Sequence, residues 1–300
     1  MSKCRICRGQ AFTTLLSEFK SELGEVYALK RCNRCSFISV DPLPTPAILR
    51  RHYNRDYWQF RQSKTTDLLN LRYKLQMLGI IRNIKKLVPQ KGKILDWGAG
   101  DGSLVRLLKE AGFTCWGIDT YSAGPNNTNL INTTIEEIPF PNNFFDAITC
   151  FHVLEHIYDP VTSLTKAFGL LKTGGVLVIE VPNIESCGFQ IFKKKWYPID
   201  LPIHLNHFNP AVIQRLLSMA GNTRIIKTKY FSHRHSPSIT VLSLFPSISP
   251  QRVRRKNSGR YPLPLMVLYL ILQLAAYPLP LLGSLIKRGE IIRMYVRKIG

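Results

Sequence analysis

Four cysteines near the N-terminus form two C-x-x-C pairs, Cys4 with Cys7 and Cys32 with Cys35. Each pair can present two thiolates from one tight turn, and two such turns together supply the tetrahedral sulfur ligands that Zn²⁺ prefers. A redox dithiol needs only one such pair, so the duplication favours a metal. Because four protein ligands leave no open coordination position, the sequence predicts a structural zinc that holds this module together.

Four histidines have side chains suited to accept a proton near neutral pH: His152, His156, His204 and His207. We take His152 and His156 as the candidate catalytic residues, because they follow an apolar strand pattern. The alternative, that Glu155 and His156 only organise the turn after that strand, stays open. We reject a metal site at His204 and His207 because the sequence offers no third ligand near them.

A glycine-rich turn is the main candidate for a cofactor site. The segment 93–112 (KILDWGAGDGSLVRLLKEAG) has the pattern of a strand, a turn and a helix, with Gly98, Gly100 and Gly102 in the turn. Glycine has no side chain, so a ligand can lie directly against this backbone at the carboxyl end of the strand. A dinucleotide-binding fingerprint would need another glycine where the chain has Ser103, which weakens the NAD interpretation.

This segment resembles motif I of class I S-adenosylmethionine-dependent methyltransferases, in which an acidic residue precedes three alternating glycines. Further segments match at the right intervals: TCWGID ends at Asp119, where the family places a carboxylate that accepts hydrogen bonds from the ribose, and 135–160 and 171–183 match the fourth and fifth strands. Thr134 replaces an aspartate that often contacts the adenine. The resemblance implies these cofactor-binding residues: Asp96, Gly98, Ala99, Gly100, Gly102, Asp119, Thr120, Glu136 and Phe151.

The order of the predicted elements indicates an α/β, Rossmann-like fold. Strands and helices alternate from residue 93 to residue 221, and strands near 224–229 and 291–297 would complete the seven-stranded methyltransferase sheet, the last one antiparallel. Before the sheet, residues 67–88 predict an amphipathic helix that packs on the catalytic domain. Its expected buried stripe consists of Leu68, Leu71, Leu75, Leu78, Ile81 and Ile84.

Composition divides the chain into five segments. They are a zinc-ribbon-like module (1–45), a linker and capping helix (46–90), an S-adenosylmethionine-binding core (91–242), a basic and hydrophobic insertion (243–288) and the last strand of the core (289–300). Within the insertion, 262–286 carries no charge and is long enough to cross a membrane. Pro278 and Pro280 interrupt it, however, and a single span would separate the last strand from its sheet.

We therefore expect the insertion to form a C-terminal helical hairpin that dips into an anionic lipid surface, with its basic flanks on the phosphates. A hydrophobic cap buried on the protein or in a dimer is the alternative. The chain has 41 Lys and Arg against 19 Asp and Glu, a net charge of +22, which favours polyanionic partners such as nucleic acid, anionic lipid or phosphorylated glycan carriers. The N-terminus has no signal-peptide pattern, so we expect a cytoplasmic protein, peripheral on the inner face of the membrane.

Together, these features predict a methyltransferase similar to the ubiquinone and glycan-cluster type, acting by O- or C-methylation on a small-molecule, glycan or lipid-linked acceptor. An RNA-modifying methyltransferase is the alternative, although Thr149 to His152 (TCFH) stands where enzymes that methylate base amines carry Asn or Asp, two prolines and an aromatic residue. A non-enzymatic, zinc-dependent interaction protein is a third hypothesis, which the intact glycine turn disfavours. The acceptor atom, the base and the oligomeric state stay open.

Overall fold

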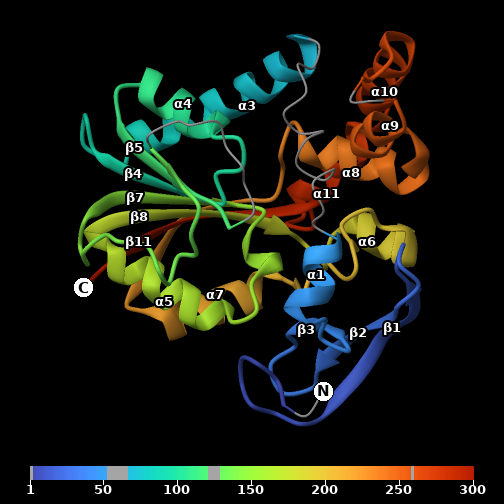
Figure 1. Ribbon diagram of the computed structural model, residues 1–300, viewed down its shortest axis with the longest axis horizontal. Coiled ribbons are helices and arrows are strands. Elements are labelled where there is room, and N and C mark those ends of the chain that lie inside the picture. Colours follow the sequence, from blue (N-terminus) through green and yellow to red (C-terminus); the bar gives the residue numbers. More distant parts are fainter. Residues whose placement is uncertain (1–2, 53–66, 121–128, 258–259) are drawn as a thin grey trace.

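The computed structural model describes residues 3–52, 67–120, 129–257 and 260–300, and a seven-stranded sheet forms its centre (Figure 1). The strand order is β10-β11-β8-β7-β4-β5-β6. The strands are β4 (Lys93–Trp97), β5 (Thr114–Ile118), β6 (Leu130–Ile131), β7 (Phe145–Phe151), β8 (Leu171–Pro182), β10 (Thr223–Lys229) and β11 (Ile291–Lys298). Only β11 runs antiparallel to its neighbours, β8 and β10. The predicted Rossmann-like sheet, including its antiparallel last strand, is confirmed.

Helices cover both faces of this sheet, with α3 (Asp67–Lys85) and α4 (Ser103–Glu110) on one side and α5 (Pro160–Leu170) and α7 (Pro210–Ala220) on the other (Figure 1). Two of them begin with proline after a capping residue. The Asp159 carboxylate accepts hydrogen bonds from the first amides of α5, and the Asn209 side chain accepts one from Val212 of α7. These caps fix where each helix starts, and therefore which face it buries.

The buried stripe predicted for α3 is only partly correct. Ile81 and Ile84 are buried as expected, but Leu71, Leu75 and Leu78 are 50%, 60% and 42% exposed, and the side chain of Leu68 lies outside the described residues. The side chains that pack into the core are Met77, Ile80, Ile81 and Ile84. The helix carries two apolar stripes at helical spacing, and the sheet covers the one near its C-terminal end.

A smaller four-stranded sheet contains the N-terminal module. Its strands are β1 (Phe12–Lys20), β2 (Val26–Cys32), β3 (Ile38–Asp41) and β9 (Asn206–His207), in that order, and α1 (Pro46–His52) follows β3. Because β9 comes from the predicted core, the module is continuous with the catalytic domain. Cys4, Cys32 and Phe37 also belong to the same hydrophobic cluster as the central strands. The predicted boundary at residue 45 is therefore one of composition and not of packing.

The insertion is helical and lies at the carboxyl ends of the parallel strands (Figure 1). Helix α8 (His235–Leu244) leads into it from the predicted core, and it contains η3 (Pro246–Ile248), α9 (Pro250–Lys256), α10 (Leu263–Ala276) and α11 (Pro278–Leu285). The chain then returns to the sheet, where Ile291 pairs with Pro182 at the end of β8. Three short helical segments complete the same end of the molecule: η1 (Leu154–His156), α6 (Cys187–Phe192) and η2 (Lys193–Lys195).

Candidate functional site

The glycine turn after β4 has a backbone that requires glycine. Gly98, Gly100 and Gly102 have φ angles of +82°, +53° and +72°, in the left-handed region. A Cβ on Gly98 would lie 2.1 Å from Cγ2 of Val153, so the loop after β7 packs directly on the turn. The amide of Gly98 donates to the carbonyl of Ile118 at 2.8 Å, which ties the turn to the end of β5. The turn is therefore held closely between β5 and the loop after β7, at the carboxyl edge of the sheet.

Three carboxylates gather around this turn. Asp119 follows β5 and its Oδ2 accepts a hydrogen bond from the amide of Gly100 at 3.0 Å. Asp96, at the end of β4, is 4% exposed and accepts a hydrogen bond from the Thr149 hydroxyl at 2.7 Å. Burial, together with the charges of Asp119 and Asp101, raises the pKa of Asp96 to about 7. The carboxylates of Asp119 and Asp101 beside the turn favour a positively charged ligand.

The other predicted cofactor residues lie around the same edge, with one difference. Ala99 is buried in the turn, Thr120 is exposed directly after Asp119, and Phe151 is half-buried at the end of β7. Glu136 is exposed and accepts a hydrogen bond from Ser163 in the first turn of α5. The structure therefore brings Ala99, Thr120 and Phe151 to the carboxyl ends of β4, β5 and β7. It pairs Glu136 with a helix on the other face of the sheet, so the contact of Glu136 with a cofactor stays a prediction.

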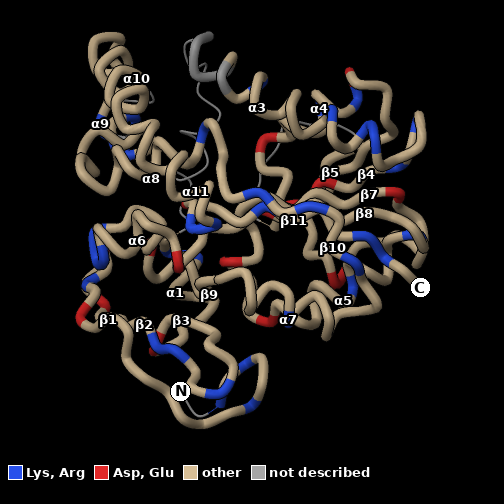
Figure 2. The backbone as a smooth tube through the Cα atoms, turned by 180° about the vertical axis from the view of Figure 1, so that it is seen from behind, with Lys and Arg blue, Asp and Glu red and all other residues tan. Residues whose placement is uncertain are grey.

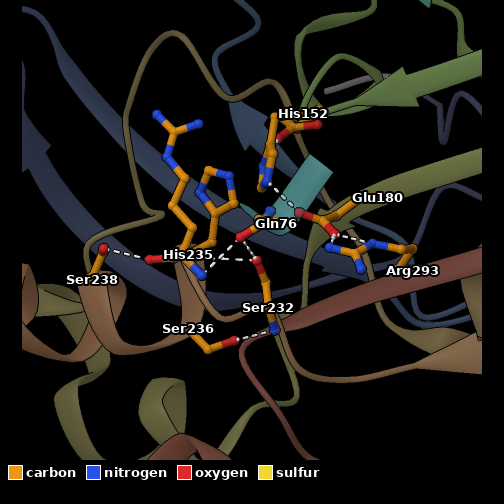
Figure 3. Close-up of polar contacts among 10 residues, drawn as sticks. Gln76, His152, Glu180, Ser232, His235, Ser236, Ser238 and Arg293 are labelled. Carbon is orange, nitrogen blue, oxygen red and sulfur yellow. Dashed lines mark hydrogen bonds and ion pairs between the residues drawn. The ribbon is translucent and has the colours of Figure 1, made fainter. Parts of the chain in front are cut away.

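His152 lies between two carboxylates, one of which, Glu180, is labelled in Figure 3. Its Nδ1 lies 3.2 Å from Oε1 of Glu155 and its Nε2 lies 3.1 Å from Oε1 of Glu180. Burial disfavours the charged ring, but the hydrogen bonds and charges of the two carboxylates outweigh it and raise the pKa of His152 to about 9. At neutral pH the ring already holds the proton that a general base would accept. To act as a base, His152 must first lose one of these partners.

The sequence did not single out the residues that complete this network. Arg293 of β11 faces Glu180 of β8, and its Nε lies 2.5 Å from Oε2 of that carboxylate, with exposures of 5% and 1%. Burial favours the neutral acid, but Arg293 and His152 hold the pKa of Glu180 below its usual range. The sequence did contain a signal for this pair, since Glu180 and Arg293 are each a charged residue inside an apolar strand pattern. A buried charge requires a partner, so two such residues of opposite charge indicate an ion pair.

His235, the first residue of α8, is stacked against His152, with ring centroids 4.4 Å apart. Burial and the positive charge of His152 lower the pKa of His235 well below its usual value, so one ring of the pair is charged and the other neutral. The segment before α8 is held by Gln76 of α3, whose Oε1 accepts hydrogen bonds from the Ser232 hydroxyl at 3.1 Å and the Arg234 amide at 2.8 Å (Figure 3). The start of α8, the helix that leads into the insertion, therefore contributes directly to the site.

His156, the second candidate catalytic residue, lies in η1 beside a different histidine. Its ring centroid is 4.7 Å from that of His204, which comes from the loop before β9. Burial and the charge of His204 lower the pKa of His156 to about 4, so its ring is neutral at neutral pH. His207 is also buried, which lowers its pKa to about 3. The histidines thus form two groups, His152 with His235 and His156 with His204 and His207.

A family model described as "Methyltransferase domain" matches residues 57–223. The chain belongs to this methyltransferase family. It is 28% identical over 158 residues to a ubiquinone biosynthesis O-methyltransferase of Dinoroseobacter shibae, covering 47% of this chain and 64% of that protein. One from Cereibacter sphaeroides is 30% identical over 161 residues, with the same coverage of 47% and 64%. The matches thus span just under two thirds of these relatives.

A solved structure confirms the fold of this methyltransferase. The 1,6-didemethyltoxoflavin-N1-methyltransferase of Burkholderia thailandensis, solved with bound S-adenosylhomocysteine, superposes with a TM-score of 0.52 at 14% identity, covering 95% of this chain and 100% of that one. The chain is therefore a class I methyltransferase by fold. Its own residues fit S-adenosylmethionine, since the left-handed glycine turn and the Asp119 side chain lie together at the carboxyl edge of the sheet, and a carboxylate suits a cationic ligand.

The cysteine cluster of the methyltransferase has the dimensions of a tetrahedral sulfur site. The Sγ atoms of Cys4 and Cys35 are 3.6 Å apart and those of Cys7 and Cys32 are 3.5 Å apart, and all four lie within 4.8 Å of one another. Four sulfurs bound to zinc at about 2.3 Å would be separated by roughly 3.8 Å. The residues predicted as ligands are thus brought together, while the presence of zinc stays a prediction.

Proposed function

We propose that this chain transfers a methyl group from S-adenosylmethionine to a hydroxyl oxygen of a lipid-linked acceptor at a membrane surface, with a structural zinc in its cysteine cluster. Family membership supports methyl transfer, and the names of the relatives, ubiquinone biosynthesis O-methyltransferases, support oxygen as the acceptor atom. One observation carries the membrane part of the proposal. It is an exposed apolar surface on α10 and α11, which adjoins the site.

Bound S-adenosylmethionine supplies a methyl group on a positively charged sulfur. The chain's contribution is to hold donor and acceptor in line, because alignment provides most of the catalysis in such a displacement. The glycine turn holds the donor, and Asp119 is placed to accept hydrogen bonds from its ribose. Val153 packs on Gly98, so the loop with His152 lies directly beside the donor. There the charged ring of His152, whose two nitrogens are held by Glu155 and Glu180, places a fixed positive charge beside the acceptor.

The exposed surface, here named the apolar ledge, consists of side chains that are each 40% to 73% exposed. They are Leu263, Val267, Leu268, Ile271, Leu274, Leu281, Leu282, Leu285 and Ile286. Among the described residues, one helical stretch, Leu263–Leu285, has the length and composition to cross a membrane, with a mean hydropathy of 2.0 and only 22% of its apolar window buried. Monomeric proteins rarely leave so large an apolar surface in water, so the ledge requires an occupant.

A lipid surface fits the ledge better than a span does. The stretch is divided at Pro278 into α10 and α11, and the 14 residues of α10 alone reach about 21 Å, less than the roughly 30 Å of a bilayer core. Both ends of the insertion also return to the same sheet, since β11 pairs with β8 along its length. Lys287 and Arg288, which follow the ledge in the chain, and Arg252 and Lys256 of α9 are exposed. Figure 2 shows basic residues on α9, the helix beside α10. Apolar side chains with basic flanks are the combination that binds anionic interfaces.

The ledge is joined to the site through α8. Both α10 and α11 pack against α8, whose first residue is His235, stacked on His152. An acceptor with its tail in the lipid at the ledge would therefore have its head group close to the charged network. This connection supports a lipid-linked acceptor over a freely diffusing one.

Vesicle flotation tests the membrane part. Wild-type protein should float with anionic vesicles, and salt should weaken binding because it screens the basic flanks. Ile271→Asp with Leu274→Asp, at positions 56% and 73% exposed, should abolish flotation without unfolding the protein, whereas Val26→Asp, at an equally exposed apolar position in β2, should float normally. Wild-type protein that stays with the soluble fraction at low salt and sediments as a dimer would refute the lipid surface and assign the ledge to a second copy.

Methyl transfer is tested separately with tritiated S-adenosylmethionine. The protein is incubated with vesicles made from the membrane lipids of its own cell and with total RNA of that cell. Label that enters the organic phase and resists mild alkali supports an ether on a lipid-linked acceptor. Label in RNA would replace this proposal with the RNA-modifying alternative, and absence of transfer and of cofactor binding would favour a non-enzymatic role.

A further inference from the structure

The first C-x-x-C turn contains a side chain that reaches the loops around η1. Arg5 lies inside this turn, and its Nη1 donates to the carbonyl of Tyr158 at 2.7 Å. Its Nη2 donates to Oδ1 of Asn206 at 2.7 Å and to the carbonyl of Leu205 at 3.2 Å. One guanidinium therefore connects the cysteine module with the loop after η1 and with the start of β9.

The cysteine module holds Arg5 in place. The amide of Arg8 donates to the carbonyl of Cys4 at 3.0 Å, which closes the turn around Arg5. The guanidinium carbon lies 5.5 Å from the centre of the Phe37 ring, within range of a cation–π contact. Phe37 is buried and comes two residues after the second C-x-x-C pair. Arg5 is thus fixed by both halves of the module.

Asn206 extends this connection to both ends of η1. Its Nδ2 donates to the carbonyl of Leu154 at 3.0 Å and to that of Ile157 at 2.7 Å. Asn206 is 1% exposed, so these bonds form away from water, where they are strongest. One buried amide therefore holds the first residue of η1 and the residue that follows it.

Helix η1 depends on such outside contacts because it is short. A 3₁₀ helix of three residues makes few hydrogen bonds of its own, and its last carbonyls have no partner inside it. The carbonyl of Glu155, in the middle of η1, accepts a hydrogen bond from the amide of Leu205 at 2.8 Å. The position of Glu155 is therefore set by the contacts that Leu205, Asn206 and Arg5 make.

His152, just before η1, needs this support because its backbone is strained. Its φ angle is +55°, in the left-handed region that residues other than glycine seldom adopt. Such a residue keeps its conformation only when its surroundings fix it from several sides. Its amide donates to the carbonyl of Glu180 at 2.9 Å, and Nδ1 of its ring is held by Glu155 at 3.2 Å. The second of these contacts depends on where η1 lies.

We propose that Arg5 and Asn206 are positioning residues for methyl transfer, which hold η1 so that Glu155 stays against His152. The cysteine module is then a working part of the acceptor side of the site. This inference rests on the role of His152 in the proposed function, but its test measures the His152 ring directly and needs no acceptor.

The pKa of His152 reports whether Glu155 is in place. Among the described residues, the groups that face the ring are Glu155 on η1, Glu180 on β8 and the stacked ring of His235 on α8, with Arg293 of β11 behind Glu180 (Figure 3). The two carboxylates raise the pKa of His152 to about 9. A carboxylate this close raises the pKa of a histidine by roughly 1–3 units, so loss of the Glu155 contact should be readily visible.

Nuclear magnetic resonance of the histidine ring carbons measures this pKa in the intact protein, with the His152 signal assigned from His152→Gln. Arg5→Ala should lower the pKa of His152 by about one unit or more. The sign separates positioning from charge, because removal of a positive charge alone would raise the pKa. Arg5→Lys, which keeps the charge but cannot form the same fork of bonds, should give a smaller fall.

Asp146→Ala is the matched control. Asp146 accepts hydrogen bonds from the amide of Lys93 and from Nζ of Lys172, each at 2.8 Å, at the amino ends of β4 and β7. The substitution therefore removes a charged side chain with two bonds at the opposite edge of the sheet. The pKa of His152 should stay at its wild-type value in this variant.

Asn206→Leu tests the second residue with a side chain of similar volume that carries no donor and no charge, and it should also lower the pKa of His152. Circular dichroism checks that each variant is folded. The inference is wrong if His152 titrates near 6.5 in the wild type, if it keeps its wild-type pKa in folded Arg5→Ala or folded Asn206→Leu, or if Asp146→Ala lowers its pKa equally. Absence of methyl transfer by the wild type would count against the proposed function and would leave this titration unchanged.

Discussion

Replacing Asp96 with asparagine should make the protein more stable at high pH and leave it unchanged at low pH. The carboxyl of Asp96 is 4% exposed, and burial raises its pKa from the usual 3.8 to about 7. The folded state therefore holds a proton that the unfolded state releases between these values, and stability must fall as pH rises through this range. Asparagine resembles the protonated acid and can keep the hydrogen bond from Thr149.

The size of the effect follows from the shift of the pKa. A difference of about three pKa units corresponds to roughly 4 kcal/mol between pH below 4 and pH above 7. Unfolding entropy scales with chain length, so for 300 residues this change corresponds to a melting temperature higher by about 6 °C. Asp96→Asn should therefore match the wild type near pH 4 and exceed it by up to that amount near pH 8.

Urea unfolding of both proteins from pH 4 to pH 8.5 measures the difference directly. Thr149→Val is the matched control: it removes the hydrogen bond that stabilises the ionised form, so the loss of stability should extend to higher pH. A difference between Asp96→Asn and wild type that is the same at both ends of the pH range would show that the carboxyl is not held in its neutral form, and would refute the reasoning.

Three further predictions test separate parts of the site. Asp119→Ala should weaken S-adenosylmethionine binding by roughly 10- to 100-fold in calorimetry while the protein stays folded, because hydrogen bonds to a charged group are lost; unchanged affinity would reject this position for the ribose. Wild-type protein prepared anaerobically should contain about one zinc per chain, and Cys4→Ser with Cys7→Ser should release it, whereas metal analysis without zinc in the wild type would reject the site. Arg5 donates to the carbonyl of Tyr158 and to Oδ1 of Asn206 at 2.7 Å each, so Arg5→Ala should lower the free energy of unfolding by about 3 kcal/mol. Arg5→Lys should recover only part of this free energy, because lysine cannot form both bonds as a planar fork. Equal stability of the three proteins would contradict this.

The sequence predicted the features that depend on local pattern. The glycine turn, with Asp96 before it and Asp119 after the next strand, is set by residues close together in the chain, and the alternation of strands and helices leads directly to the sheet. The two C-x-x-C pairs are equally local. In each case one short segment contains both the residues and the geometry that they require.

The histidine clusters could not be predicted because their partners lie far apart in the chain. Neighbours of His204 were sought within the sequence around it, whereas the structure places Glu155 and His156 beside it from about fifty residues earlier, through the pairing of β9 with β3 and the contact of that loop with η1. The prediction of the buried face of α3 was partly wrong for a related reason. Periodicity shows which side chains share a face, but only the position of the sheet decides which face is covered.

The insertion and the last strand act on the site as one continuous unit. His235 begins α8, the ledge follows on α10 and α11, and Arg293 lies in the strand to which the chain returns. Two members of the network around His152 therefore flank the apolar ledge in the chain: His235 precedes it and Arg293 follows it. Helix α10 packs against α8, which begins with the neutral ring stacked on His152, while the glycine turn is held separately by β5. This arrangement would let contact with lipid affect the acceptor side of the site without disturbing the donor side, which is what an enzyme needs if its cofactor arrives from water and its substrate from a membrane.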